Sequence, residues 1–460
     1  MKWSRYNHLF RSTRRGWLLY NSAANAFVQI EDDVYPEILK IQCDPDAYDF
    51  GKDPGFYFQL RSNGILVQDR DEDIRRNLLK LTRLSTKYDT SHLLLTIAPT
   101  RACNFSCFYC YEHDREAVFM SDETAEKVVQ FIKRLKTVRD LYIVWYGGEP
   151  LLCFDRICSL TARIQELALP FDSFLVTNGF LLDREKIEKL HDLKIGMVQV
   201  TIDGPETIHN KRRPLRGGGP TFATILQNLE QLFQKWDGRV NVRINIDEAN
   251  RDHYHLIHDE LVERYRQAYD GKRLWIYPGL VHDYPGTNPD IGCLISPEKE
   301  AEFTIEQYRK HGIDDLRTFP RRAFGGCTAC RWNGFVIGPE GEIYKCWDDI
   351  GVAERQIGSV RPGSTWNGAI VSDYMVAASY LDDPKCDECF FLPVCDGGCA
   401  QARLCNLLDG RNNDHCLKFK YHLEELLDIH FERKEKEGRT AGEAASSDTG
   451  GTESPGDKQT

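Results

Sequence analysis

The chain has 460 residues, of which 41% are hydrophobic and 11% aromatic, so it encodes a folded protein of two or three domains and not a disordered one. Its net charge is −11 and its basic residues are scattered, which argues against nucleic acid as a partner. No run of eighteen apolar residues occurs and the polar N-terminus does not resemble a signal peptide, so we expect a cytoplasmic protein without a membrane partner.

Cysteine is unusually frequent, with 16 residues in the chain. The cytoplasm keeps thiols reduced, so a disulfide scaffold is not expected there. Metal or cluster ligation is the better expectation, and the spacing of the cysteines decides between the two.

Residues 1–90 predict a small separate module with a winged-helix-like order of elements. Short β-type runs on either side of Asn21–Asn25 predict a hairpin. Two helices, a closing strand and an exit helix follow. The predicted ranges are Trp17–Tyr20 and Ala26–Ile30 for the hairpin, Val34–Ile41 and Pro54–Arg61 for the helices, Gly64–Val67 for the strand and Asp71–Lys87 for the exit helix.

Residues 91–315 alternate between short apolar runs and amphipathic segments, which predicts an α/β fold of six βα units. The strands are expected at Leu93–Ile97, Tyr142–Tyr146, Phe174–Asn178, Val198–Asp203, Val240–Ile246 and Leu274–Pro278. The helices are expected at Thr124–Leu135, Arg156–Leu167, Glu185–Leu193, Phe222–Phe233 and Tyr254–Tyr269. Right-handed crossovers would join the strands into a parallel sheet, here a partial (β/α)6 TIM-like barrel. Chemistry collects at the carboxyl ends of such strands.

Residues 316–433 form a cysteine-rich region of short elements, in which helical periodicity returns only at Lys418–Phe431. Residues 434–460 are rich in Gly, Ser, Thr and acidic residues. They bury too little apolar surface to offset the entropy of ordering, so we expect a disordered tail.

The first cysteine cluster consists of Cys103, Cys107 and Cys110 in the segment C-N-F-S-C-F-Y-C, after the first strand of the barrel. A [4Fe–4S] cluster needs four ligands, so three cysteines leave one iron open to a small molecule that carries an amine and a carboxylate. A partial zinc site, or buried cysteines that act as small hydrophobic residues, are the alternatives.

The C-x3-C-x2-C spacing, with an aromatic residue before the last cysteine, resembles the signature of radical S-adenosylmethionine (SAM) enzymes. The resemblance implies that the open iron binds SAM. It also implies reductive cleavage of SAM to a 5′-deoxyadenosyl radical, which abstracts a hydrogen atom from the substrate.

The segment Gly147-Gly148-Glu149-Pro150 ends the second strand and resembles the GGEP motif of that family, which meets the SAM amino group. Glycine lets the backbone approach a ligand closely, and Glu149 offers acceptors to an ammonium group. A simple strand-ending turn explains the two glycines but not the following Glu-Pro.

Other polar residues at strand ends resemble SAM contacts of the family. Asn178 and Asp203 end the third and fourth strands and would lie near the SAM ribose and carboxylate, although both residue types also form turns. Arg213 would meet the SAM carboxylate, with a solvated surface arginine as the alternative. Tyr109 would pack on adenine or only shield the cluster.

The C-terminal cysteines have the spacing Cys386-x2-Cys389-x5-Cys395-x3-Cys399, and Gly341 precedes Cys346 by five positions. They resemble the SPASM domain, which binds two auxiliary [4Fe–4S] clusters and brings the total to three; a pair of zinc ribbons is the alternative. The resemblance implies Cys327, Cys330, Cys346 and Cys399 for the first cluster and Cys386, Cys389, Cys395 and Cys416 for the second. Cys405 competes with Cys416 for the last position. The five cysteines left over, expected to be structural, are Cys43, Cys153, Cys158, Cys293 and Cys405.

SPASM enzymes act mostly on peptides or proteins, and two branches compete. We expect a maturase of ribosomally made peptides that installs a crosslink, a thioether first and a carbon–carbon bond second. The alternative is oxidation of a Cys or Ser by an anaerobic sulfatase maturase. Those maturases carry a proposed catalytic aspartate directly after the position of Cys346, where this chain has Trp347. Asp348 or Asp349 could still serve as the base.

The N-terminal module resembles the leader-peptide recognition domain that is fused to many peptide maturases. Such domains bind an extended peptide along a strand edge. The implied partners are a precursor peptide with its leader and an electron donor such as flavodoxin or ferredoxin. The auxiliary clusters would accept the electron left on the substrate or relay electrons inward. An iron–sulfur redox sensor and a zinc-stapled binding protein are the non-enzymatic alternatives.

Overall fold

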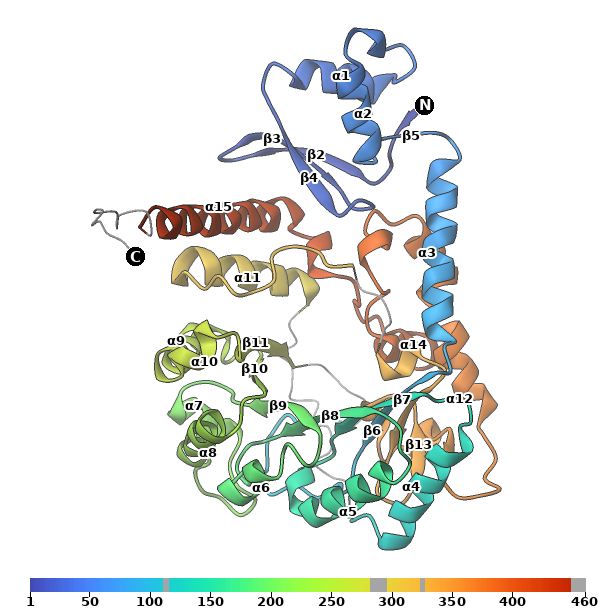
Figure 1. The fold of residues 1–460 in the computed structure, drawn as a ribbon, viewed down its shortest axis with the longest axis vertical. Helices are drawn as coiled ribbons and strands as arrows, with labels where there is room; N and C mark the ends of the chain where they lie inside the picture. The colour runs from blue at the N-terminus through green and yellow to red at the C-terminus, as the bar shows by residue number, and fades with distance from the viewer. Residues whose placement is uncertain (111–115, 282–295, 323–326, 448–460) are drawn as a thin grey trace, which may run out of the picture. The chain divides into compact units, whose positions relative to one another are not determined.

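The computed structural model describes residues 1–110, 116–281, 296–322 and 327–447, with side chains up to residue 437. The chain folds into two compact units (Figure 1). The first unit combines Met1–Glu72 with Glu298–Arg321 and Lys418–Thr460. The second unit combines Asp73–Pro297 with Arg322–Leu417.

The first unit is built on a three-stranded antiparallel sheet in the order β2 (Asn7–Ser12), β3 (Gly16–Asn21) and β4 (Ala26–Ile30). Strands β3 and β4 form the predicted hairpin, in which Leu19 pairs with Val28. The sequence analysis did not predict β2. A second small sheet pairs β1 (Lys2–Trp3) with β5 (Leu66–Val67), the closing strand that the sequence predicts.

One face of the three-stranded sheet packs against α1 (Tyr35–Cys43) and α2 (Pro54–Ser62), close to the predicted helices. Trp17 stacks on Tyr35 with 3.6 Å between the ring centroids. The buried members of this core are Leu19, Ile30, Ile38, Ile41, Leu60, Ile65 and Leu66. Branched aliphatic side chains at helical and strand spacing therefore form the core of a small module.

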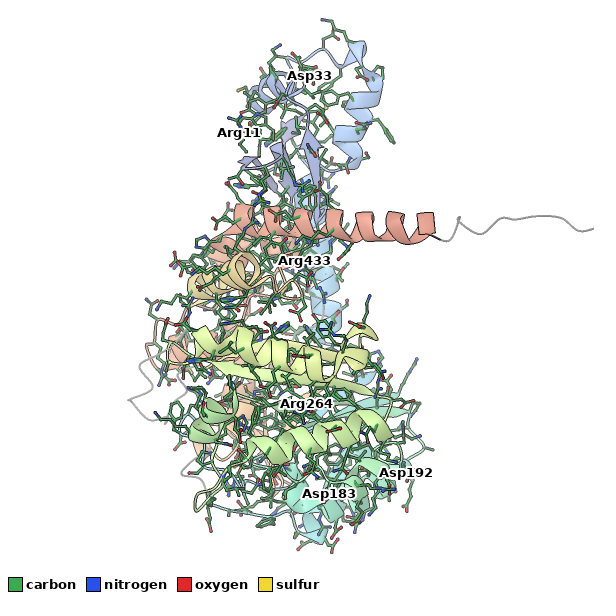
Figure 2. The ribbon with its side chains drawn as sticks, turned by 90° about the vertical axis from the view of Figure 1, so that its left-hand side faces the viewer. Arg11, Asp33, Asp183, Asp192, Arg264 and Arg433 are labelled. Carbon is green, nitrogen blue, oxygen red and sulfur yellow. The ribbon has the colours of Figure 1, made fainter. Side chains whose placement is uncertain are left out.

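Two later helices complete the first unit: α11 (Pro297–His311), which was not predicted, and α15 (Leu423–Ser447). Phe27 of β4 packs on Phe431 of α15, with ring centroids 3.9 Å apart. Arg309 of α11 donates to both carboxylate oxygens of Glu432, at 2.7 and 2.8 Å. Figure 2 shows Arg433 on α15, and its guanidinium donates to the carbonyl oxygen of Leu316 at 2.8 Å.

Helix α15 corrects the prediction of a disordered tail for residues 434–447, because it continues to Ser447. Helix propagation is cooperative, so a helix nucleated by packed residues extends through a polar segment that contains good helix formers. The predicted disorder of residues 448–460 lies outside the described residues.

The second unit contains a nine-stranded sheet in the order β11-β10-β9-β8-β7-β6-β12-β13-β14. Its first six strands are parallel and confirm the predicted βα series. They are β6 (His92–Ile97), β7 (Asp140–Trp145), β8 (Phe171–Thr177), β9 (Ile195–Thr201), β10 (Arg239–Ile246) and β11 (Leu274–Leu280). The unpredicted β12 (Gly334–Ile337) pairs with β6, and β13 (Glu342–Tyr344) and β14 (Gly358–Ser359) follow antiparallel.

The crossover helices lie below and to the left of the strands in the view of Figure 1. They are α4 (Asp122–Arg134), α5 (Phe154–Gln165), α6 (Arg184–Glu188), α7 (Glu206–Arg212), α8 (Phe222–Lys235), α9 (Tyr254–Arg264) and α10 (Arg266–Asp270). The single helix predicted at Tyr254–Tyr269 is divided at Tyr265, whose hydroxyl donates to the carbonyl oxygen of Leu226 at 2.8 Å. The backbone of Tyr265 is not helical, with φ −117° and ψ 35°.

Helix α3 (Asp71–Lys87) matches the predicted exit helix and packs on the cysteine-rich segment of the second unit. Arg76 and Lys80 both bond Asp387, at 3.3 and 2.9 Å. Arg83 donates to the carbonyl oxygens of Leu392 and Cys395 at 2.8 and 2.6 Å. Three short helices there are α12 (Gly368–Ser372), α13 (Pro384–Asp387) and α14 (Ala400–Leu408). Across the described ranges, no helix is long and apolar enough to cross a bilayer.

Candidate active site

The first cysteine cluster, Cys103, Cys107 and Cys110, lies in the loop that follows β6, at the edge where the parallel strands end. The loop closes on itself, because the amide of Cys110 donates to the carbonyl oxygen of Cys107 at 3.2 Å. The amide of Phe105 donates to Cys103 Sγ at 3.4 Å. Cys107 is buried. Burial raises the pKa of the Cys103 thiol, Cys107 and Cys110 lie close enough to raise it further, and the sulfur atom of Cys103 has an N–H donor.

A distant segment fixes this loop through its backbone. The amide of Ser106 donates to the carbonyl oxygen of Pro214 at 2.9 Å, and the amide of Arg216 donates to that of Asn104 at 2.7 Å. Phe105 forms an isolated antiparallel bridge with Leu215. The chain after α7 thus holds the cysteine loop as a short sheet-like pairing.

The two glycines after β7 allow the backbone to approach the cysteine loop. The amides of Gly148 and Glu149 donate to the carbonyl oxygens of Thr100 and Ala102 at 3.2 and 2.8 Å. A Cβ atom on Gly147 would lie 2.3 Å from the oxygen of Thr100, and one on Gly148 would lie 2.4 Å from that of Ala102. The glycines are therefore required because the backbone after β7 touches the backbone of Thr100 and Ala102. The sequence predicted instead that they allow the backbone to approach a ligand.

Glu149 is fully buried and joins the ends of β7 and β8. Its Oε1 accepts hydrogen bonds from Thr177 Oγ1 at 2.7 Å and from the amide of Leu151 at 3.0 Å. Its Oε2 accepts one from the amide of Asn178 at 2.7 Å. Burial raises the pKa of Glu149, and the three hydrogen bonds oppose that rise.

Tyr109 and Arg213 meet at this edge. The Arg213 guanidinium donates to the Tyr109 hydroxyl at 2.5 Å, and Asn245 Nδ2 donates to the same oxygen at 3.0 Å. Asn178 Nδ2 donates to Asn104 Oδ1 at 2.8 Å, next to the cysteines. The arginine lies in the interior, only 7% exposed, and not on the surface.

Asp203 is fully buried and lies within a network of arginines. Arg212 Nε donates to Asp203 Oδ2 at 3.2 Å, while the other nitrogens of that guanidinium donate to Asp247 at 2.9 and 3.2 Å. Arg213 Nη1 is 3.9 Å from Asp203 Oδ1. Burial raises the pKa of Asp203, and the charges of Arg213 and Arg212 oppose it.

The structure brings together every residue that the sequence analysis predicted for SAM. These are Tyr109, Gly147, Gly148, Glu149, Asn178, Asp203 and Arg213, all at the edge where β6 to β10 end. Two buried donors at this edge, Asn104 Nδ2 and Arg213 Nε, lack a hydrogen-bond partner within the described residues. Such donors fit a ligand that carries a carboxylate, and the three thiols fit an iron–sulfur cluster with one open iron.

The later cysteines fall into two sets. The first cysteine set is Cys327, Cys330, Cys346 and Cys399, whose thiols lie close enough to influence one another electrostatically. Cys327 Sγ and Cys330 Sγ are 4.0 Å apart. Cys330 of this set lines a cavity of about 50 Å³, together with Tyr374, Tyr380, Gly398, Arg83 and Lys87 among others. Four thiols that lie this close together fit the four-cysteine ligation of a [4Fe–4S] cluster.

The second cysteine set is Cys386, Cys389, Cys395 and Cys416. The amides of Phe391 and Gly397 donate to Cys389 Sγ and Cys395 Sγ at 3.4 and 3.2 Å. Arg403 Nη2 donates to Cys386 Sγ at 2.9 Å. N–H donors aimed at sulfur suit thiolates that ligate iron.

Cys416 and Cys405 have different surroundings. Cys416 follows His415, and a Cβ atom on Gly398 would meet the carbonyl oxygen of His415 at 1.8 Å, so this segment touches the chain between Cys395 and Cys399. Cys405 is buried on α14 beside Asp409. These surroundings favour Cys416 as the last ligand.

All fifteen cysteines within the described ranges are free thiols, whereas Cys293 lies outside them. In the same ranges, no group of three or more His, Cys, Asp or Glu side chains is arranged to hold a single metal ion.

A sequence profile of the radical SAM superfamily matches residues 97–261, which span the cysteine loop and the strand ends described above. This chain is an enzyme with a radical SAM domain. The two non-enzymatic alternatives, a redox sensor and a zinc-stapled binding protein, are therefore set aside.

The curated relatives of this radical SAM enzyme include sulfatase maturases. It is 26% identical over 362 residues to the serine-type anaerobic sulfatase-maturating enzyme of Bacteroides thetaiotaomicron, covering 69% of this chain and 85% of that protein. It is 25% identical over 345 residues to the cysteine-type enzyme of Clostridium perfringens, covering 68% and 90%. The solved structure of native anSMEcpe with bound AdoMet has a TM-score of 0.55 at 20% identity, covering 76% of this chain and 100% of that one. This likeness shows a shared fold.

The radical SAM enzyme places its two predicted catalytic acids differently. Asp349 is 3% exposed and its Oδ2 accepts a hydrogen bond from the Tyr374 hydroxyl at 2.6 Å. Asp348 is half-buried, with Oδ2 3.5 Å from Cys346 Sγ. Trp347 stacks on Tyr146, the residue before Gly147, with centroids 5.2 Å apart. The residue after Cys346 thus makes an aromatic contact with the SAM edge, by which we mean the edge where β6 to β10 end and the residues predicted for SAM lie.

Several residues of the site were missed by the sequence analysis. Asn104, Arg212 and Asn245 contact the predicted residues directly, and Asp247 bonds Arg212. Asp247 follows β10 just as Asn178 follows β8, so the same strand-end rule could have found it. Arg212 and Asn104 carry no local signal, because only the fold turns them toward the site.

Proposed function

We propose that this radical SAM enzyme modifies a ribosomally made precursor peptide, which it recognises through a leader segment bound by the first unit. The observation that carries this proposal is the extra sheet-containing unit. About a quarter of this chain lies outside the match to anSMEcpe, although the match spans the whole of that protein. Strands β2 and β4 are edge strands of the three-stranded sheet, and an edge strand can add an extended peptide through main-chain hydrogen bonds.

Two groups of residues would hold the cofactors at the edge where β6 to β10 end. Cys103, Cys107 and Cys110 would bind a [4Fe–4S] cluster, and the unpartnered donors of Asn104 and Arg213 would orient the SAM carboxylate. Together, the bound cluster and SAM supply a 5′-deoxyadenosyl radical that abstracts hydrogen from the substrate.

The first and second cysteine sets would each hold an auxiliary [4Fe–4S] cluster, for a total of three. Full ligation by four thiolates leaves no open iron, which suits electron transfer. A flavodoxin or ferredoxin would be the external electron carrier.

Asp348 is the better candidate base of the two acids, because Asp349 is buried and bonded to Tyr374. With its carboxylate beside Cys346, Asp348 would take the proton released when the new bond forms. The stacked Trp347 and Tyr146 would form an apolar wall next to it. A thioether crosslink from a cysteine thiol is the first expectation, and a carbon–carbon bond the second.

Oxidation of a Cys or Ser side chain, as the names of the curated relatives indicate for those proteins, is the second candidate. Identities of 25–26% over most of the relatives' lengths favour it. Trp347, in the position where the resemblance places an aspartate, argues against it.

The test gives the reconstituted enzyme SAM, a strong reductant and one of two substrates. One is a cysteine-containing precursor peptide with its leader, and the other is a peptide from a sulfatase. Crosslinking is expected to remove two hydrogens, retain sulfur and protect the thiol from alkylation. An aldehyde product that reacts with a hydrazide would establish the sulfatase-type reaction instead. Absence of 5′-deoxyadenosine with both peptides would contradict each proposal.

A further inference from the structure

Helix α14 touches both cysteine sets. Cys399 of the first set is its N-cap, and Arg403 lies one turn later, with its amide donating to the Cys399 carbonyl oxygen at 3.1 Å. The side chain of Arg403 then reaches Cys386 of the second set. One rigid turn of helix therefore joins a ligand of one set to a charged neighbour of the other.

The Arg403 guanidinium is 10% exposed and held on three sides. It donates to Cys386 Sγ at 2.9 Å, to the Gly397 carbonyl oxygen at 2.7 Å and to Asp383 Oδ2 at 3.0 Å. Because an arginine is always protonated in a protein, this is a fixed positive charge. The geometry directs that charge at a sulfur atom.

Asp383 opposes this charge at the same sulfur. Its Oδ2 lies 3.7 Å from Cys386 Sγ, farther than the guanidinium nitrogen. Asp383 also caps α13, because its side chain accepts a hydrogen bond from the amide of Lys385. An asparagine at this position would keep the cap and remove the charge.

Arg83 of α3 places a second fixed cation beside the set. It is 5% exposed, and its Nε and Nη1 have no hydrogen-bond partner within the described residues. It donates to the Cys395 carbonyl oxygen at 2.6 Å, and Asp396 lies 3.9 Å from its Nε. Arg76 and Lys80, on the same helix, are both paired with Asp387.

A cluster gains one negative charge when it is reduced, so nearby cations and hydrogen bonds to sulfur favour the reduced form, and nearby carboxylates disfavour it. We propose that Arg403, through its hydrogen bond to Cys386, raises the reduction potential of the cluster held by the second cysteine set, and that Asp383 lowers it. Arg83 raises it further through its buried charge. This inference rests on the proposed function, because it requires an auxiliary cluster at this set.

The experiment is a redox titration of the anaerobically reconstituted full-length protein, monitored by electron paramagnetic resonance. Comparison with Cys389→Ala, which lacks a ligand of the second set, assigns the signal of that cluster. The variants are Arg403→Gln, Arg403→Lys, Asp383→Asn and Arg83→Met. Arg264→Gln serves as the control, because this residue of α9 is 44% exposed and pairs with Glu230 far from the cysteines in sequence.

In Arg403→Gln, the ratio of reduced to oxidised cluster at the wild-type midpoint should fall about tenfold, which is 59 mV for one electron. Arg83→Met should shift the midpoint in the same direction, and Arg403→Lys should shift it less. Asp383→Asn should shift it upward. A merely structural role of the pair would not give opposite signs for Arg403→Gln and Asp383→Asn.

Unchanged midpoints in Arg403→Gln and Asp383→Asn, with full iron content, would overturn the inference alone. If Arg403→Gln loses iron, an unchanged midpoint in both Asp383→Asn and Arg83→Met would overturn it. A different result would contradict the second cluster itself, and therefore this part of the proposed function. It is an iron content well below about twelve atoms per wild-type chain, together with the same paramagnetic signals in the wild type and in Cys389→Ala.

Discussion

At the scale of single residues, two glycines fix the distance between the GGEP segment and the cysteine loop. The amides of Gly148 and Glu149 donate hydrogen bonds to carbonyl oxygens in the segment that precedes Cys103. Because a carbonyl oxygen of the backbone cannot move aside as a flexible side chain can, the space for a Cβ atom is absent. The geometry of the SAM edge therefore depends on residues that contribute no side chain.

Gly148→Ala should disturb the cysteine loop, because its Cβ atom would lie 2.4 and 2.5 Å from the oxygens of Ala102 and Arg101. We expect a loss of about 2–4 kcal/mol of stability from the steric conflict and a fall in the iron bound by the loop. Thermal unfolding and iron analysis measure both. Gly196→Ala is the matched control, because nothing lies within 4 Å of its Cβ position. Equal behaviour of the two variants would contradict this account.

At the scale of secondary-structure elements, local signals position the start of the crossover helix α4. Ser121 precedes α4, and its Oγ accepts a hydrogen bond from the amide of Thr124 at 3.1 Å. Asp122 and Glu123 occupy the first turn, where acids interact well with the helix dipole. These features are visible in the sequence, and so the predicted start of this helix lies within two residues of the observed one.

Ser121→Ala should destabilise the protein by about 1 kcal/mol, because the amide of Thr124 loses its acceptor. Ser121→Asp should retain most of the stability, since an aspartate also accepts this hydrogen bond. Urea unfolding of the two variants and the wild type measures the difference. If both substitutions cost the same, the cap is not what stabilises the start of α4.

At the scale of the whole molecule, the first unit joins segments that are far apart in the sequence. His430 of α15 stacks on Phe319, with centroids 4.5 Å apart, and meets Phe27 of β4 edge-on. Burial, followed by the charges of Arg433 and Lys434, lowers the pKa of His430 from 6.5 to about 4, while Glu437 opposes the shift. The aromatic contact between these three segments thus favours the neutral imidazole.

This pKa shift predicts a pH dependence of stability. The unfolded chain takes up a proton near pH 6.5, and the folded protein does so only near pH 4. The contribution of neutral His430 to the free energy of unfolding is therefore fully present above pH 6.5 and is lost as the pH falls from 6.5 to 4. His430 is partly exposed, so we expect a loss of roughly 1–2 kcal/mol.

The measurement compares unfolding of the wild type and of His430→Gln at pH 7 and pH 5. Subtracting the two proteins removes the titration of all other groups. The destabilisation on acidification should be smaller in His430→Gln. An identical decrease in both proteins would mean that this histidine does not favour the neutral form in the fold.

The sequence by itself determined the parallel βα series and, through its resemblance to the radical SAM family, several of the residues that meet at its edge. The series follows from local rules, namely apolar runs of strand length and helical periodicity, whereas Asn178 and Asp203 are assigned to the site by that resemblance. The cysteine spacing likewise indicated two later sets before any contact between them was known.

Only the tertiary structure decided which distant segments complete each unit. Helices α11 and α15 join the N-terminal sheet, and β12 extends the parallel sheet beside β6. Arg212 and Arg403 gain their roles from contacts across the fold, with Asp203 and Cys386. No local pattern encodes such contacts, because the free energy of a buried ion pair or N–H···S bond depends on which groups the fold brings within reach.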